Sequence, residues 1–280
     1  MITFKELFEK IENLKNLDDI DFFTVGNSTL GIPIYGVHIG SYYGKQVLVE
    51  GALHAREYIT SLLLVKQVEH LKNENFEGGI YFVPLMNPDG VKLVLDGASN
   101  LESKLQKYLI DVNSDKTDFS LWKANANTVD LNVNFDALWG KGSQNVFSPA
   151  PANFVGYYAN SEREVNDLIK FTLKIMPDLT LSYHSKGNVI YYGFEMLSEE
   201  EIARDLKIAN VFALETGYTV IKTENSTGGF SDWVSLVLKI PAFTIEVGSD
   251  EISHPITEEF LPEIFEKNKD IPLIALKQIQ

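Results

Sequence analysis

The segment from Gln46 to Leu71 constrains the fold most strongly, because an apolar β-rich run passes directly into an apolar helical pattern. The run Gln46-Val-Leu-Val-Glu-Gly favours a strand, and apolar residues recur at helical spacing from Glu57 to about Leu71. A Gly-Gly pair at 78–79 then precedes a second β-rich run, Ile80-Tyr-Phe-Val-Pro-Leu. This succession of strand, helix and strand predicts an α/β fold.

Further β-rich runs and helix-start signals extend this pattern along the chain. The stretch 41–45 between the runs 34–40 and 46–51 is typical of a hairpin. Ser161 with Glu164, and Ser198 with Glu201, each have capping-box spacing and predict helix starts. We therefore expect a mixed β-sheet flanked by helices, with later strands at 179–184, 189–192, 218–221 and 242–247.

The domain organisation is expected to be simple. No low-complexity linker, shift of composition or internal repeat divides the 280 residues, so we predict a single domain over 1–280. Residues 1–18 predict an N-terminal amphipathic helix. The irregular stretches 96–128 and 137–160 predict loops that cover a site.

Composition excludes several classes of partner and chemistry. The formal charge of -15 opposes binding to nucleic acid or to an anionic membrane surface. The chain has no cysteine, which leaves His, Asp and Glu as metal ligands. No run suits a membrane span or a signal peptide, so we expect a cytoplasmic protein.

A candidate metal site begins where the first β-rich run ends. His54 and Glu57 are three residues apart, a spacing that directs a nitrogen and a carboxylate to one side of a helical turn. The alternative is a solvated pair on a helix. A hydrolytic zinc needs a third ligand, and His184 is the best of the remaining histidines because it ends an apolar strand-like run. His38 and His70 fit structural or solvent-facing roles.

Glu246 is the candidate general base. It lies within the apolar run Pro241-Ala-Phe-Thr-Ile-Glu-Val-Gly, where an acid is costly unless it is paired, catalytic or at the strand end. A carboxylate near a metal can take a proton from the bound water and return it to a leaving amine. A buried salt bridge is an equally good explanation of this segment taken alone.

Taken together, seven segments resemble the zinc carboxypeptidase family over roughly residues 34 to 250. Their order and spacing both match. The segments are His54-Ala-Arg-Glu57, Met86-Asn-Pro-Asp-Gly-Val91, Trp122-Lys-Ala-Asn125, Asp130-Leu-Asn-Val-Asn-Phe135, Ser182-Tyr-His-Ser185, Gly228-Gly-Phe-Ser-Asp-Trp233 and Phe243-Thr-Ile-Glu-Val247. The resemblance implies that His54, Glu57 and His184 bind one Zn²⁺, and that Glu246 is the general base and acid acting through its water.

Two further roles follow from the resemblance. Asp130 matches the acid that orients the first zinc histidine, although a turn or capping aspartate is the alternative. Lys123 matches a position where the family has an arginine that stabilises the developing oxyanion. Lysine lacks the planar fork of arginine, and a solvated surface lysine is the alternative.

The main departure from the family pattern is Val133, where the family usually has an arginine that grips the free carboxylate of the substrate. Valine cannot bind a carboxylate. Asn132 remains as a substrate-binding residue, and Arg56, Lys186 or His254 could supply the missing charge. The stretch 218–227 also lacks an obvious match to the family's mobile tyrosine.

Several segments, including Trp122-Lys-Ala-Asn125 and Gly228-Gly-Phe-Ser-Asp-Trp233, look more like bacterial γ-D-glutamyl-diamino acid peptidases. That resemblance implies a small peptide substrate derived from peptidoglycan, with Asp232 meeting an ammonium group. A helix N-terminal acid is the equally good alternative for Asp232. An ordinary carboxypeptidase, a catalytically silent zinc-binding domain and a deacylase of the same superfamily are the other candidate functions.

Overall fold

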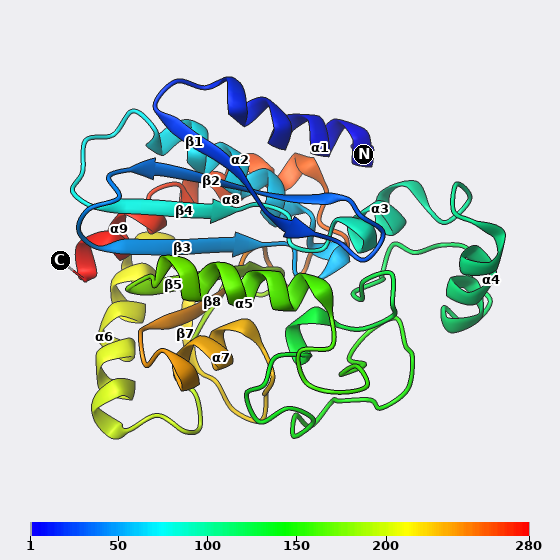
Figure 1. Cartoon of the computed structure of the whole chain (residues 1–280). Helices are drawn as coiled ribbons and strands as arrows, with labels where there is room; N and C mark the ends of the chain where they lie inside the picture. The colour runs from blue at the N-terminus through cyan, green and yellow to red at the C-terminus, as the bar shows by residue number, and fades with distance from the viewer. Residues whose placement is uncertain (1, 280) are drawn as a thin grey trace.

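Residues 2–279, which the computed structural model describes, form an eight-stranded mixed sheet with helices on both faces (Figure 1). The strand order is β1-β2-β4-β3-β5-β8-β6-β7. The strands are β1 (Ile20–Asn27), β2 (Pro33–Gly40), β3 (Gln46–Gly51), β4 (Gly79–Val83), β5 (Leu179–His184), β6 (Val189–Tyr192), β7 (Thr219–Lys222) and β8 (Ala242–Glu246). The predicted mixed sheet flanked by helices is confirmed.

The four central strands β4, β3, β5 and β8 run parallel to one another. Every residue of β3, β4 and β5 is buried, including polar residues such as Glu50 in β3 and Ser182 in β5. Parallel strands end at the same edge of a sheet. Polar residues at the carboxyl ends of β3, β5 and β8 are therefore brought close together.

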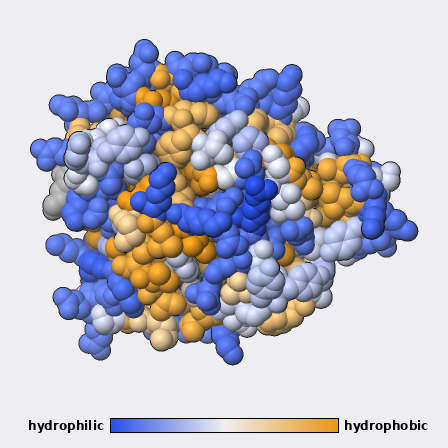
Figure 2. All heavy atoms as spheres, viewed as in Figure 1, coloured by the Kyte–Doolittle hydropathy of each residue, from blue (hydrophilic) through white to orange (hydrophobic). Residues whose placement is uncertain are grey.

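Helices cover the two faces unequally. Apolar residues of α1, α2, α6, α8 and α9 pack on one face, and those of α5 and α7 pack on the other. The exposed side of α5 is hydrophilic, whereas hydrophobic residues gather around α7 (Figure 2). The helices are α1 (Phe4–Asn13), α2 (Ile59–Leu71), α3 (Pro88–Asp96), α4 (Ser103–Val112), α5 (Arg163–Ile175), α6 (Glu199–Thr216), α7 (Phe230–Val237), α8 (Leu261–Asn268) and α9 (Ile271–Gln278).

The predicted hairpin at 41–45 is wrong. Strands β2 and β3 do not pair with each other, because β4 lies between them, antiparallel to β2 and parallel to β3. Gly79 at the start of β4 is backed closely by the Gln46 side chain and the Ser41 carbonyl, so β4 enters where only a glycine fits. Residues 41–45 therefore connect β2 to β3 across β4, the strand that lies between them.

One of the two predicted capping boxes is also wrong. Helix α5 begins at Arg163 with Glu162 at the N-cap, and the two predicted cap residues are held by other partners. Ser161 donates to Glu162, and Glu164 accepts from the Thr29 amide at 2.9 Å. The second box is confirmed, because Ser198 and Glu201 bond reciprocally at the start of α6.

The terminal and irregular segments contain some regular structure. Helix α1 and a short 3₁₀ turn at Leu14–Asn16 occupy most of 1–18, and α4 lies within 96–128. The stretch 137–160 is irregular apart from an isolated bridge between Val146 and Phe154. None of the helices in residues 2–279 has the length and hydrophobicity needed to cross a lipid bilayer.

Candidate metal centre and cleft

The candidate site lies at the carboxyl ends of three central strands. His54 follows β3 and caps the 3₁₀ turn Ala55–Glu57, and α2 begins two residues after Glu57. His184 is the last residue of β5 and Glu246 the last residue of β8. The two are register partners in adjacent parallel strands, so the sheet itself places Glu246 beside a candidate ligand.

Three side chains converge at this edge. Nδ1 of His54 lies 3.0 Å from Oε1 of Glu57, and Nδ1 of His184 lies 2.9 Å from Oε2 of the same carboxylate. The two Nδ1 atoms are 3.1 Å apart. All three side chains are at least nine-tenths buried. This is the group of side chains in residues 2–279 whose ligand atoms lie close enough together to hold a metal ion.

The chemistry of these donors fits a divalent cation. Burial works to raise the pKa of Glu57, but His54 and His184 hold it well below its usual value, so the carboxylate is ionised. The Ser185 amide also donates to it at 3.2 Å. Two imidazole nitrogens and one carboxylate, gathered with their ligand atoms facing one another, are a donor set that suits zinc.

Asp130 lies directly behind His54. Its Oδ1 atom is 3.2 Å from Nε2 of His54, on the side of the ring opposite Glu57. Burial works to raise the pKa of Asp130, but Lys123 and His54 hold it well below its usual value. A carboxylate that accepts from Nε2 leaves the lone pair of Nδ1 directed toward Glu57 and His184.

Lys123 contacts Asp130 and lines the cleft. Its Nζ atom lies 3.3 Å from Oδ2 of Asp130, and its side chain is 16% exposed. The solvated alternative is therefore a poor description of Lys123, since the ammonium is largely enclosed beside the candidate ligands. It places a positive charge close to His54.

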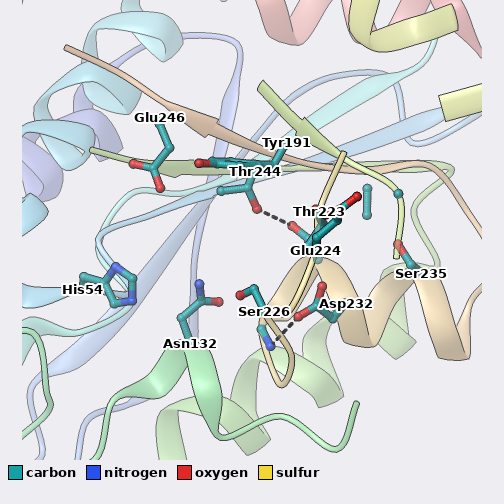
Figure 3. Close-up of a pocket in the computed structure, with 14 residues that line it drawn as sticks. His54, Asn132, Tyr191, Thr223, Glu224, Ser226, Asp232, Ser235, Thr244 and Glu246 are labelled. Atoms are coloured by element: carbon teal, nitrogen blue, oxygen red, sulfur yellow. Dashed lines mark hydrogen bonds between the residues drawn. The ribbon is translucent and has the colours of Figure 1, made fainter. Parts of the chain in front are cut away.

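Glu246 faces the same space from the other side (Figure 3). Burial, and next the negative charge of Glu57, raise the pKa of Glu246 to about 8. Its Oε2 atom has no hydrogen-bond partner among the described residues. The alternative of a buried salt bridge finds no partner within salt-bridge distance in residues 2–279.

A cavity of about 300 Å³ opens between His54 and Glu246 at one end and Asp232 at the other (Figure 3). Asp232 accepts from the Gly229 amide at 2.9 Å. Burial, and secondarily the charge of Glu195, raise the pKa of Asp232 to about 7. The other lining residues are mostly small or hydroxylic: Thr223, Ser226, Ser231, Ser235, Ala242 and Thr244.

A second cavity of about 240 Å³ continues the cleft in another direction. It shares His54, Asn132, Glu224 and Ser226 with the first, so the two are branches that meet at the candidate metal centre. Val133 lines only the second branch. Further lining comes from the predicted site-covering stretch 137–160: Gly142, Ser143, Gln144, Asn145 and Asn153.

Only some of the predicted substrate-binding residues and covering segments reach the cleft. Lys186 lines neither branch, and its Nζ atom bonds the Asp250 carbonyl and lies 3.6 Å from the Asp250 carboxylate. Asn132 lines both branches, and its Oδ1 accepts from the Phe230 amide at 3.1 Å. Of the segment 96–128, Lys123 reaches the cleft, whereas α4 packs in a separate apolar cluster with Phe119 and Trp122.

Two groups of residues near the candidate metal centre were not predicted from the sequence. Tyr191 of β6 lines the first branch and points its hydroxyl toward Glu246 (Figure 3), but an aromatic residue in a strand gives no functional signal by itself. Glu50 and Ser182 lie beneath His184. An acid inside the apolar run 46–51 was a signal of the same kind as Glu246, and it could have been found in the same way.

The fold and the buried ligand cluster define a class: a mixed α/β protein with a candidate metal centre at the ends of its central parallel strands. The zinc carboxypeptidase family matches residues 11–271, so the chain belongs to the zinc carboxypeptidase family, whose members are zinc metallopeptidases. The resemblance predicted from the seven segments is confirmed.

Two curated relatives are similar to this chain in sequence. The gamma-D-glutamyl-L-diamino acid endopeptidase 1 of Lysinibacillus sphaericus is 32% identical over 250 residues, covering 84% of this chain and 62% of that protein. The uncharacterized protein YqgT of Bacillus subtilis is 30% identical, covering 84% of this chain and 66% of that protein. The chain thus spans less than two thirds of the length of either relative.

Solved structures share the fold. Bovine thrombin-activatable fibrinolysis inhibitor has a TM-score of 0.75 and 19% identity, covering 98% of this chain and 95% of that one. The murein-tripeptide amidase MpaA of Escherichia coli O157 has a TM-score of 0.55 and 21% identity, covering 91% of each chain. At these identities the likeness establishes the carboxypeptidase-type fold.

Proposed function

We propose that this protein is a zinc-dependent peptidase that hydrolyses the amide bond between γ-D-glutamate and a diamino acid in a peptidoglycan-derived peptide. One observation carries the proposal: His54, Glu57 and His184 converge beside Glu246 at the ends of β3, β5 and β8. Family membership supports the zinc peptidase, and the name of the Lysinibacillus relative supports the bond. One Zn²⁺ is held by His54, Glu57 and His184.

Several of the residues described above have separate roles in the proposed chemistry. Zinc, when bound, polarises the scissile carbonyl and lowers the pKa of a water toward neutrality. A cation held beside Glu246 would lower its pKa from the raised value of the metal-free site. The ionised carboxylate then takes the proton from the attacking water and returns it to the leaving amine. Lys123 supplies positive charge for the oxygen that becomes negative, and Asp130 holds His54 in the tautomer that presents Nδ1.

The first branch of the cleft suits the side chain of a diamino acid. Asp232 lies at the far end from His54, and the exposed Glu224 is a further lining residue. A carboxylate in an enclosed, hydroxyl-lined space is a good partner for an ammonium group. Asn132, which lines both branches, is placed to hold the peptide where they meet.

The second branch favours an endopeptidase over the runner-up, an ordinary carboxypeptidase. Val133 offers no charge to a free terminal carboxylate, and the cleft continues past it over Gly142, Asn145 and Asn153. The substrate chain can therefore extend beyond the diamino acid. The family match also supports an ordinary carboxypeptidase. The reaction products must therefore distinguish the endopeptidase from the carboxypeptidase.

Mass spectrometry of reaction products tests the proposal. Zinc-loaded protein is offered L-Ala-γ-D-Glu-diaminopimelate, the same peptide extended by D-Ala, ordinary peptides with free C-termini and acetylated amino acids. Cleavage of the γ-D-glutamyl bond supports the proposal. Release of terminal residues from ordinary peptides would establish the carboxypeptidase, deacetylation would establish the deacylase, and bound zinc with no turnover on the panel would support the silent domain.

A further inference from the structure

The two candidate metal-binding histidines receive different support on the side facing away from the metal. His54 meets the Asp130 carboxylate directly, with 3.2 Å between Nε2 and Oδ1. His184 instead has the Ser182 hydroxyl 3.1 Å from its Nε2 atom. Ser182 in turn donates to Oε1 of Glu50. Each histidine ring is therefore linked to a carboxylate. His54 contacts Asp130 directly, and His184 is linked to Glu50 through the Ser182 hydroxyl.

The sheet builds this second chain of contacts. Glu50 of β3 and Ser182 of β5 are register partners in neighbouring parallel strands, so their side chains leave the same face of the sheet side by side. His184 lies two residues beyond Ser182 and projects on that face as well. Glu50, Ser182 and His184 are each at most 1% exposed, which excludes bulk water as a competing partner.

Counting protons fixes the direction of the bonds when Glu50 is ionised. Burial raises the pKa of Glu50 to about 7, so this condition holds above that pH. A serine hydroxyl has one proton, and a neighbouring carboxylate is its strongest acceptor. With that proton directed to Glu50, the oxygen of Ser182 can only accept from His184, so Nε2 of His184 carries the ring proton. Asn132 Nδ2 lies 3.5 Å from the same nitrogen, a longer and weaker contact than that of the Ser182 hydroxyl.

We propose that Glu50, acting through Ser182, is the positioning residue that fixes the tautomer of His184 and keeps Nδ1 available to the metal. This inference rests on the proposed zinc site. Glu50 touches neither the metal ligands' donor atoms nor the cleft, and its Oε2 atom has no partner among the described residues. A buried carboxyl group with this environment has no evident packing role. A cation bound at the neighbouring ligands would favour its ionised form, which accepts from Ser182.

The first test needs no variant. In metal-free wild-type protein labelled with ¹⁵N-histidine, NMR at a pH where the ring is neutral should show His184 protonated at Nε2, with slow exchange of that proton. His184→Ala identifies the signal among the five histidines. A neutral His184 protonated at Nδ1 would overturn the proposal, because Ser182 would then be donating to the ring.

The second test measures zinc affinity by competition with a chromogenic chelator. Ser182→Ala and Glu50→Gln should each weaken zinc binding by about tenfold to a hundredfold, and the double variant should lose little more than the worse single one. Thr180→Val is the matched control, since Thr180 is buried two residues earlier on β5 and its hydroxyl has no partner in residues 2–279.

Thermal unfolding of the metal-free variants separates folding from metal binding. Wild-type zinc affinity in folded Ser182→Ala and Glu50→Gln would overturn the proposal, even if the protein still hydrolyses its substrate. Conversely, weakened affinity with the predicted His184 signal would support the relay even if the substrate proved to be a different peptide. The two proposals can therefore fail independently.

Discussion

His184 and Glu246 are register partners at the ends of β5 and β8, so a candidate metal ligand and a candidate proton carrier occupy adjacent positions on one edge of the sheet. No flexible loop separates them. Catalytic groups on rigid strands keep their geometry without further ordering, which is why this pairing is the part of the site that the fold determines most directly.

Glu246→Gln should bind zinc like the wild type and lose about 10²- to 10⁴-fold in kcat. Glutamine keeps the shape of the side chain but cannot accept a proton. Metal content measured by mass spectrometry checks zinc binding, and turnover of the peptidoglycan-derived peptide checks kcat. Glu199→Gln, on the exposed first turn of α6, is the control and should behave like the wild type. Unchanged kcat in Glu246→Gln would refute the assignment.

His184→Ala should lose zinc, because it removes one of three protein donors. His70→Ala is the matched control, since His70 bonds Asp270 and lies outside the centre. Zinc stabilises a folded state that binds it, by about 2.7 kcal/mol at a free concentration one hundred times Kd. We therefore expect added zinc to raise the Tm of wild type and His70→Ala but not of His184→Ala. Equal shifts in all three proteins would contradict the ligand set.

Asp232 should make recognition of a diamino acid depend on pH. Burial raises its pKa to about 7, so the carboxylate is largely neutral below that pH and charged above it. Only the charged form attracts an ammonium group. The ratio of kcat/KM for wild type to that for Asp232→Asn should therefore rise between about pH 6 and pH 8.

Comparing the two proteins as a ratio removes the titration of other groups in the site. Asparagine can still accept from the Gly229 amide, so the start of α7 is preserved. Glu224→Gln, at an exposed lining residue of the same branch, is the control and should retain the pH dependence. A flat ratio for Asp232→Asn would show that Asp232 does not bind the ammonium.

Val133→Arg should shift preference toward peptides with a free terminal carboxylate. A charge-assisted bond of about 1.5–3 kcal/mol corresponds to roughly a tenfold to hundredfold gain in kcat/KM for such peptides over their amides. Val133→Leu keeps the side chain apolar and should leave the preference unchanged. No gain in Val133→Arg would mean that the second branch does not hold the substrate's carboxyl end.

The sequence allowed prediction of the features that depend on local pattern or on a motif. Buried parallel strands were recognisable as β-rich runs, and His54, Glu57 and His184 were recognisable at or just beyond their ends. The order of strands was less accessible: β4 separates β2 from β3, and that insertion is a long-range event with no local signal. Likewise, Ser161 and Glu164 had capping spacing, but Glu162 and Thr29 hold them in the folded protein.

The cleft was predictable only in part. Asp130 and Lys123 were found by resemblance, and their mutual contact at 3.3 Å required the structure. Tyr191 and Ser182 reach the site through strand register, which the sequence does not specify. Glu50 gave a sequence signal as an acid in an apolar run, but its link to His184 required the structure. Lys186 shows the reverse case, because it was a candidate to supply the charge that Val133 lacks, whereas its ammonium bonds Asp250.

Hydrolysis in H₂¹⁸O tests the central claim most directly. The zinc-loaded protein is incubated with L-Ala-γ-D-Glu-diaminopimelate extended by D-Ala, and the fragments are analysed by mass spectrometry, with chelator-treated protein as the control. We predict one ¹⁸O atom in the γ-carboxyl group of the L-Ala-D-Glu fragment, and no product after chelation. Cleavage at another bond, or equal cleavage by the chelated protein, would contradict the account.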